Sequence, residues 1–320
     1  MTSAAASTRG AFGGRQMVTA ASGSRRSILT FALVAIGILV IWEVLKFIGG
    51  VPWRAPGAGP GSPVLWNPPL RLPFANDLNL PHIWNILLAF GQPWQRGADR
   101  NVAQFLFDAS LYTWREALIG FALGALLGLA LAIVFVHSRL LERALVPYVI
   151  ASQTVPIIAL APMIVFAFGA NVTSVVIITT YLTFFPVTIA MIRGLRSFDP
   201  RAMELMRSYA ATRASILWKL RLPASLPYLF TALKISATAS IVGAIIGEGP
   251  GGISDGLGRV IITFNQYYIT GPEKLWASII AAALLGIAFF MCVRAVEVVV
   301  LRGRPGRGMT MATDDTRGRV

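Results

Sequence analysis

Few residues in this sequence could do chemistry. It contains two histidines, His82 and His137, and one cysteine, Cys292, so it offers neither a cluster of soft metal ligands nor an intramolecular disulfide. None of its lysines follows a glycine, so the phosphate-binding pattern Gly-x-x-x-x-Gly-Lys-Ser/Thr is absent. We therefore predict no catalytic residue, metal or cofactor in this chain.

Six polar residues fall within long apolar stretches and are candidates for a solute path. Such side chains can instead bond the preceding helical turn or bridge two helices. Both interpretations stay open, and so does the role of the glycine-rich stretch 248–258, which either caps the path or is a simple turn. The six path candidates are Ser152, Gln153, Thr154, Ser236, Thr238 and Ser240.

The segment 193–226 is basic and more regular than a simple connection. Asp199 followed by Pro200 is typical of a helix start, with an N-cap before proline at the first helical position. Thr212 is a second N-cap candidate, and the pair Leu222-Pro223 ends the pattern. We predict a helix to about Tyr209, a turn, and a second helix, all at a membrane surface.

The composition indicates that lipid is the main solvent of this chain. Hydrophobic residues make up 55% of it, charged residues only 13%, and the mean hydropathy is +0.66. Because backbone groups in hydrocarbon must bond internally, only helices or closed barrels can span a bilayer. The apolar stretches are continuous and long, which favours helices over barrel strands.

Six stretches are long enough to span, so the predicted fold is an all-α membrane protein with six transmembrane helices. Expected spans are 28–48, 110–136, 145–168, 172–192, 227–247 and 275–300. In the second, three glycines four residues apart, at 120, 124 and 128, predict close helix packing. The predicted parts are a disordered basic tail (1–27), a first helix (28–48), a Pro-, Gly- and Trp-rich external loop with one short helix near 82–90 (49–109), a five-helix core (110–300) and a tail (301–320).

The formal net charge is +14. We exclude nucleic-acid binding, because the charge lies between apolar spans rather than on a packed domain. Lys and Arg concentrate in both tails, in 137–144 and in 193–226, which places these segments and both termini in the cytoplasm. Near the outer end of the first span, Glu43 and Lys46 can pair on one helix face or reach toward the interface.

The stretch ELMRSYAATRASILWKLRLP resembles the EAA loop of ABC importer permeases, which reads Glu-Ala-Ala, three residues, Gly, nine residues, Ile, one residue, Leu-Pro. Glu204 matches the Glu, Ala210 stands at the Gly, and Leu222-Pro223 match the Leu-Pro. Leu205 and Met206 replace the two alanines. ALAPMIVFAFG at 159–169 and GLG at 256–258 are similar to the nitrate, sulfonate and taurine group. SQTVPIIALAP and NQYYITGPEKLW look closer to riboflavin or pyrimidine-precursor permeases.

This resemblance implies a permease subunit of an ATP-driven importer in the bacterial inner membrane. It implies a homodimer, two cytoplasmic ATPases that hold the ATP and Mg²⁺, and an external solute-binding protein. The solute would be a sulfonate, nitrate, or a heterocycle such as riboflavin or a pyrimidine precursor. The residues implied to dock the ATPase are Glu204, Leu205, Met206, Arg207, Tyr209, Ala210, Arg213, Leu222 and Pro223.

Three alternatives compete with this hypothesis. An ion-coupled carrier would keep ionisable residues in mid-membrane, and spans three and four have none. A membrane-embedded enzyme would need clustered carboxylates, a metal set or an activated nucleophile. The segment 193–226 could also lie on lipid headgroups by charge alone.

Overall fold

The computed structural model describes residues 13–54, 62–249, 253 and 255–302, with side chains from residue 29 onward except residue 31. The chain forms two compact units, Met1–Gln92 with Tyr267–Lys274, and Pro93–Gln266 with Leu275–Val320. Most of the predicted tails, 1–12 and 303–320, lies outside the described residues. So do 250–252 and 254 of the predicted glycine loop.

The first unit contains one long helix and a short irregular region. Helix α1 (Gly13–Ile48) includes the predicted first span and begins well before it. Strands β1 (Trp53–Arg54) and β2 (Val64–Trp66) pair antiparallel, followed by a 3₁₀ turn, η1 (Pro73–Ala75). Helix α2 (Ile83–Ala89) confirms the short helix expected near 82–90.

Two charged residues of α1 tie this helix to the region after it. Lys46 Nζ pairs with Asp77 and donates to the Leu80 carbonyl at 2.7 Å, and its side chain is 1% exposed. Glu43 Oε1 accepts from the Ile83 backbone N–H at 2.9 Å. Of the two alternatives left open for these residues, the Glu43–Lys46 pair is wrong, because each side chain binds the following loop instead.

Helices α3 (Val102–His137), α6 (Val172–Gly194) and α9 (Leu222–Glu248) form the core of the second unit. The predicted close packing at the three glycines is confirmed. A Cβ added at Gly120 would lie 1.6 Å from Thr179 Oγ1, and one at Gly124 would lie 2.6 Å from Thr183 Cβ. Because a side chain cannot fit there, glycine allows α3 and α6 to approach this closely.

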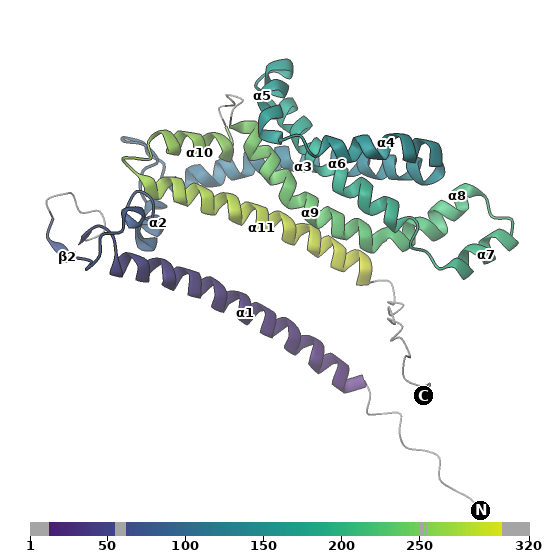
Figure 1. Cartoon of the computed structure of the whole chain (residues 1–320), viewed down its shortest axis with the longest axis horizontal. Helices are drawn as coiled ribbons and strands as arrows, with labels where there is room; N and C mark the ends of the chain where they lie inside the picture. Colours follow the sequence, from purple (N-terminus) through teal and green to yellow (C-terminus); the bar gives the residue numbers. More distant parts are fainter. Residues whose placement is uncertain (1–12, 55–61, 250–252, 254, 303–320) are drawn as a thin grey trace, which may run out of the picture. The chain divides into compact units, whose positions relative to one another are not determined.

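Helices α10 (Leu257–Gln266) and α11 (Pro272–Arg302) complete this part of the bundle (Figure 1). The α11 ring of Phe289 packs on Trp114 at 4.9 Å and on Phe121 at 5.1 Å between ring centroids. Lys234 of α9 forms an ion pair with Glu297 of α11 at 2.8 Å. Helix α10 begins at Leu257, inside the glycine-rich stretch 248–258, so the residues after this stretch are helical.

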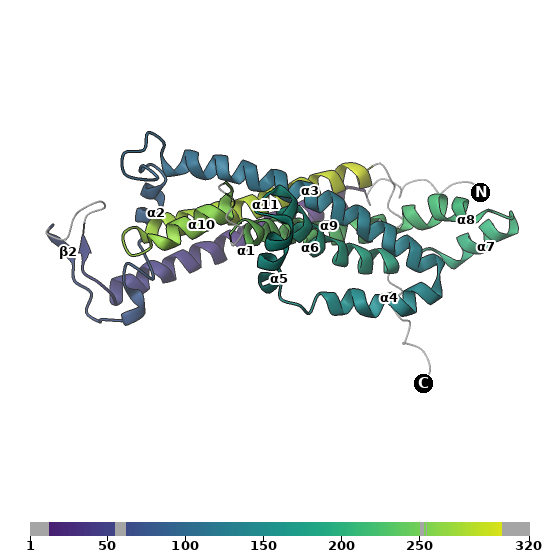
Figure 2. The same cartoon turned by 90° about the horizontal axis from the view of Figure 1, so that it is seen from above.

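The predicted third span is broken. Helices α4 (Arg139–Ser152) and α5 (Ile157–Phe168) meet at an angle of 96°, and α5 turns away from α4 in Figure 2. Pro156 explains the break, because it lacks an N–H and disfavours helical geometry in the preceding residue. The predicted loop 137–144 shrinks to a single non-helical residue, Ser138, because α4 starts at Arg139.

The second and fifth predicted spans start earlier than expected. Helix α3 begins at Val102, inside the predicted external loop 49–109, where the Asn101 side chain caps it. Helix α9 begins at Leu222 rather than at Pro227, directly after a π-helical turn, η2 (Leu217–Arg221). In a regular helix the Pro223 ring would clash with the carbonyl four residues back, and the wider π turn accommodates that clash.

Within the described residues, four helices are long and apolar enough to cross a membrane, and the bent pair α4–α5 would make a fifth. They are α3, α6, α11 and the continuous stretch Arg213–Glu248. Many large apolar side chains on these helices are exposed, as expected for surfaces that face lipid. The count of six spans and the cytoplasmic termini stay predictions.

Candidate functional site

A short helical hairpin connects the end of α6 to the start of α9 and projects from the second unit at this point (Figures 1 and 2). Its first helix is α7 (Pro200–Ser208). The Asp199 side chain accepts from the Arg201 N–H at 2.9 Å, and Pro200 needs no hydrogen-bond acceptor at the first helical position. The helix start predicted from these two residues is confirmed.

The end of α7 is a Schellman turn centred on Ala210. Ala211 N donates to the Met206 carbonyl at 3.0 Å, and Ala210 N donates to the Arg207 carbonyl at 2.9 Å. Ala210 has φ +49°, the one positive φ among the described non-glycine residues. This left-handed position usually carries glycine, because a Cβ makes it costly.

The second helix of the hairpin runs directly into the membrane helix that follows. Thr212 Oγ1 accepts from Ser215 N at 3.2 Å and caps α8 (Arg213–Ile216), as predicted. Helix α8, η2 and α9 then form one continuous element from Arg213 to Glu248. The predicted stop at Leu222-Pro223 is wrong, because the π turn carries the helix past both prolines, Pro223 and Pro227.

The hairpin exposes large apolar side chains. Leu205 is 57% exposed, Tyr209 78% and Trp218 70%, whereas Met203 on the opposite face of α7 is buried. Exposed aromatic and aliphatic groups beside charged residues are typical of a protein interaction site. Among the other predicted docking residues, Glu204, Arg207, Ala210 and Arg213 are exposed, and Met206, Leu222 and Pro223 are partly buried.

Trp218 is absent from the predicted docking residues. Its signal was available in the sequence, because a tryptophan in a basic amphipathic segment needs an apolar partner or an interface. We refer below to the exposed residues Glu204, Leu205, Arg207, Tyr209, Arg213 and Trp218 as the docking surface.

The structure separates the six path candidates into two groups. Ser236 and Ser240 are fully buried; Ser236 Oγ donates to the Thr183 carbonyl of α6 at 3.4 Å. Ser240 Oγ donates to Ala237 one turn back. Ser236 therefore bridges two helices, whereas Ser240 bonds the preceding turn of its own helix. Ser152 and Gln153 are partly buried, and Thr154 and Thr238 are exposed, with hydroxyl bonds to the preceding turn for Ser152, Thr154 and Thr238.

Sequence reasoning also missed a pair of buried carboxyl groups. Glu116 of α3 and Glu248 at the end of α9 are 1% and 0% exposed and lie beside each other. Glu248 Oε2 accepts from the Gly258 N–H at 2.7 Å, and Thr113 Oγ1 accepts from the Leu257 N–H at 2.8 Å. These bonds hold the first turn of α10 against α3 and α9.

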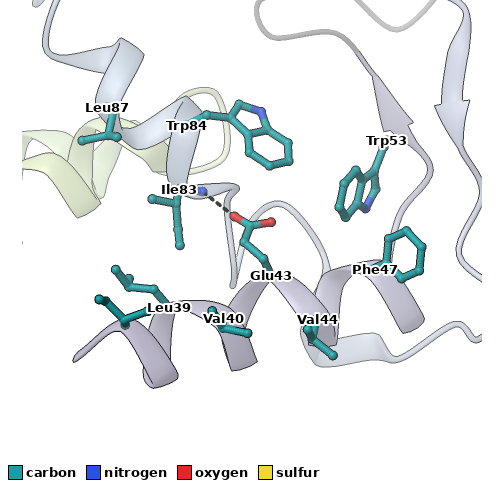
Figure 3. Close-up of a pocket in the computed structure, with 10 residues that line it drawn as sticks. Leu39, Val40, Glu43, Val44, Phe47, Trp53, Ile83, Trp84 and Leu87 are labelled. Carbon is teal, nitrogen blue, oxygen red and sulfur yellow. Dashed lines mark hydrogen bonds between the residues drawn. The ribbon is translucent and has the colours of Figure 1, made fainter. Parts of the chain in front are cut away.

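The first unit carries an open apolar pocket of about 590 Å³ between α1 and α2 (Figure 3). Glu43 is the one charged residue in its lining, and its carboxylate already bonds Ile83. The rings of Trp53 and Trp84 lie beside it with centroids 5.5 Å apart. This pocket therefore offers contact area for an apolar group.

Comparison with known proteins identifies the family. Residues 124–302 match the family described as binding-protein-dependent transport system inner membrane component. The chain belongs to this family. The match includes the hairpin, both membrane helices that flank it, and the pair α4–α5.

Individual relatives of this chain are transport permeases as well. The formylaminopyrimidine transport permease protein ThiX of Halalkalibacterium halodurans is 36% identical over 190 residues, 58% of this chain and 73% of that protein. The putative aliphatic sulfonates transport permease protein SsuC of Bacillus subtilis is 31% identical, covering 59% and 67%. The riboflavin transport system permease protein RibX of Chloroflexus aurantiacus is 29% identical, covering 62% and 72%.

This permease is thus a multi-pass inner-membrane transport subunit of an ABC importer and not an enzyme. The carrier and enzyme alternatives are wrong. The family works in general with an ATPase and a solute-binding protein, so both are partners of this chain.

Proposed function

We propose that two copies of this permease form the membrane part of an importer, with one ATPase on each docking surface and a binding protein outside. ATP and Mg²⁺ belong to the ATPases. The observation that supports this most is the hairpin itself. It exposes Leu205, Tyr209 and Trp218 at the junction of two membrane helices.

The connections of the hairpin suit it for force transmission. Helix α8 continues into α9 without a break, and five residues separate the end of α6 from the start of α7. A displacement of the hairpin would therefore move α9 as a rigid lever and pull on α6 as well. Because α6 and α9 pack closely on each other, both would move together and could change access to the path.

The experiment replaces one exposed tyrosine of the docking surface and compares it with a matched one elsewhere. Tyr209→Ala should weaken binding of the cognate ATPase about thirtyfold and abolish uptake, because truncating an aromatic interface anchor costs at least about 2 kcal/mol. Tyr148→Ala is the control, since Tyr148 of α4 is 74% exposed, close to the 78% of Tyr209. ATPase binding is measured with purified subunits and uptake with cells.

Glu204→Ala should also separate ATP hydrolysis from transport, because this exposed carboxylate can pair with a basic group of the ATPase. Normal uptake together with normal ATPase binding in both Tyr209→Ala and Glu204→Ala would refute the docking assignment. Equal losses in Tyr209→Ala and Tyr148→Ala would refute it too, because a general loss of folding would then explain both.

For the solute, we propose a small heterocycle of the pyrimidine-precursor class rather than a sulfonate or nitrate. This proposal is supported by the formylaminopyrimidine permease, which is 36% identical, against 31% for the sulfonate permease. The test is thermal melting of the cognate binding protein with formylaminopyrimidine, riboflavin, taurine and nitrate. A rise in melting temperature with taurine or nitrate alone would contradict the proposal.

A further inference from the structure

A pocket lined by arginines lies where α3 ends, α4 begins and α6 leads into α7. Its volume is about 710 Å³, and its charged lining residues are Arg139, Glu142, Arg143, Arg196 and Arg221. Both views place the first turn of α4 at the same end of the unit as α7 and α8 (Figures 1 and 2). The docking surface is a separate feature and shares no residue with this pocket.

The charges of this pocket do not balance. Among the described residues of the lining, Glu142 is the only acidic one, and it pairs with Arg196 at 2.6 Å. Arg139, Arg143 and Arg221 have no carboxylate of their own among the described lining residues. Arg196 and Arg207 both lie near enough to Arg221 to repel its positive charge. Several like charges around one cavity repel each other unless an anion lies between them.

Arg221 supplies the second observation. Its guanidinium lies over the Phe198 ring, with Cζ 5.4 Å from the ring centroid, in a cation–π contact. Its Nε–H is buried and has no acceptor among the described residues. A buried N–H without an acceptor costs free energy, so the geometry favours an acceptor that enters the pocket from outside the chain.

We propose that this pocket binds a phosphate-type oxyanion, supplied by the headgroup of an anionic phospholipid or by free phosphate. Planar guanidinium groups match the oxygens of a phosphate in a bidentate fashion. Basic pockets between membrane helices on the cytoplasmic side are suited to phospholipid headgroups. Phe198 and Val146 add apolar walls, which suit the start of an acyl chain.

General attraction of basic loops to the membrane does not explain this arrangement. Such attraction requires only that arginines be exposed near the surface. Here Arg221 is partly buried, its Nε–H is covered, and its guanidinium contacts an aromatic ring. These features indicate a formed site rather than a diffuse positive surface.

The test uses the full-length permease in a neutral detergent and follows thermal unfolding. One arm titrates short-chain phosphatidylglycerol against phosphatidylcholine, and the other titrates inorganic phosphate against chloride at equal ionic strength. The pocket variant is Arg143→Gln with Arg221→Gln. The control is Arg201→Gln with Arg302→Gln, two exposed arginines outside the pocket that give the same change of charge.

We expect phosphatidylglycerol to raise the melting temperature more than phosphatidylcholine. The half-maximal concentration should rise about thirtyfold in the pocket variant and less than about threefold in the control. If phosphate in the second arm stabilises as well, the site takes the free oxyanion; if only phosphatidylglycerol does, it takes the headgroup. Either result supports the proposal.

Three results would overturn it. In the first, the wild type is stabilised no more by phosphatidylglycerol than by phosphatidylcholine, and no more by phosphate than by chloride. In the second, the pocket variant and the control variant weaken ligand binding equally. Loss of ATPase binding in the pocket variant, with no effect of either ligand on the wild type, would instead assign the pocket to protein carboxylates. If the double variant does not fold, the single variant Arg143→Gln replaces it, because Arg143 is exposed. We expect this variant to weaken ligand binding about fivefold. Unchanged binding would overturn the proposal.

Discussion

Ala210 occupies a backbone position that disfavours its side chain, and replacing it with glycine should stabilise the hairpin. Its φ of +49° lies in the left-handed region, where a Cβ costs roughly 1–2 kcal/mol. Glycine avoids that cost and loses about 0.5–1 kcal/mol more backbone entropy on folding. The net stabilisation expected for Ala210→Gly is therefore about 0.5–1 kcal/mol.

The assay is hydrogen exchange of the amides at the end of α7, measured on the purified permease. Tyr209, Ala210 and Ala211 all donate to carbonyls of α7, at distances from 2.9 to 3.2 Å, so their amides report opening of this turn. A gain of about 0.5–1 kcal/mol slows their exchange about twofold to fivefold. Ala210→Val should accelerate it, because a β-branched residue tolerates positive φ even less.

The matched control is Ala211→Gly, one residue further along, where φ is not positive. It should leave exchange unchanged or accelerate it, because it only adds freedom to the unfolded chain. Equal effects of glycine at 210 and 211, or faster exchange in Ala210→Gly, would refute the assignment of strain to Ala210. ATPase binding, measured on the same variants, would show whether a stiffer turn changes docking.

Three further predictions concern stability, each measured as thermal unfolding of the purified chain. Gly128→Ala should cost about 1–3 kcal/mol because its Cβ would lie 2.6 Å from a backbone oxygen of α6, whereas Gly286→Ala meets nothing within 4 Å and should be neutral or stabilising. Lys46→Met should cost about 1–3 kcal/mol by removing a buried ammonium that holds the loop, whereas Arg100→Met, in an exposed pair, should cost less than about 1 kcal/mol. Burial lowers the pKa of His82 below its usual 6.5, so the unfolded chain binds the proton first and stability should fall as the pH drops below 6.5. His82→Gln should remove this dependence, and an unchanged profile would contradict the assignment.

Local signals predicted the hairpin well. Asp199 and Thr212 cap the two helices as their side chains suggest, because an N-cap bond joins residues only two or three positions apart. The spacing from Glu204 to Pro223 by itself predicts a docking role for this segment. The same local logic placed α2 and α6, whose boundaries differ from the predictions by two residues at most.

Sequence patterns predicted the helix boundaries wrongly where apolar composition favours a continuous helix and a proline favours a break. The run 145–168 is mostly apolar, has no charged residue and contains three prolines, so hydropathy predicted one span although the backbone breaks at Pro156. At Pro223 the opposite error occurred, because a π turn lets the helix continue past a residue that usually ends one. Which tendency prevails depends on how the neighbouring helices support the freed backbone groups.

The sequence by itself determined that this chain lies mainly in lipid, that its fold is helical, and where the hairpin that we propose as the docking element lies. Composition, charge distribution and short-range spacing are enough for these, since each depends on residues that are close along the chain. Only the tertiary structure decided which polar groups are buried and which are free to bind. It joined Glu116 to Glu248, and Arg221 to Phe198, because burial depends on residues that are remote in sequence and brought together by helix packing.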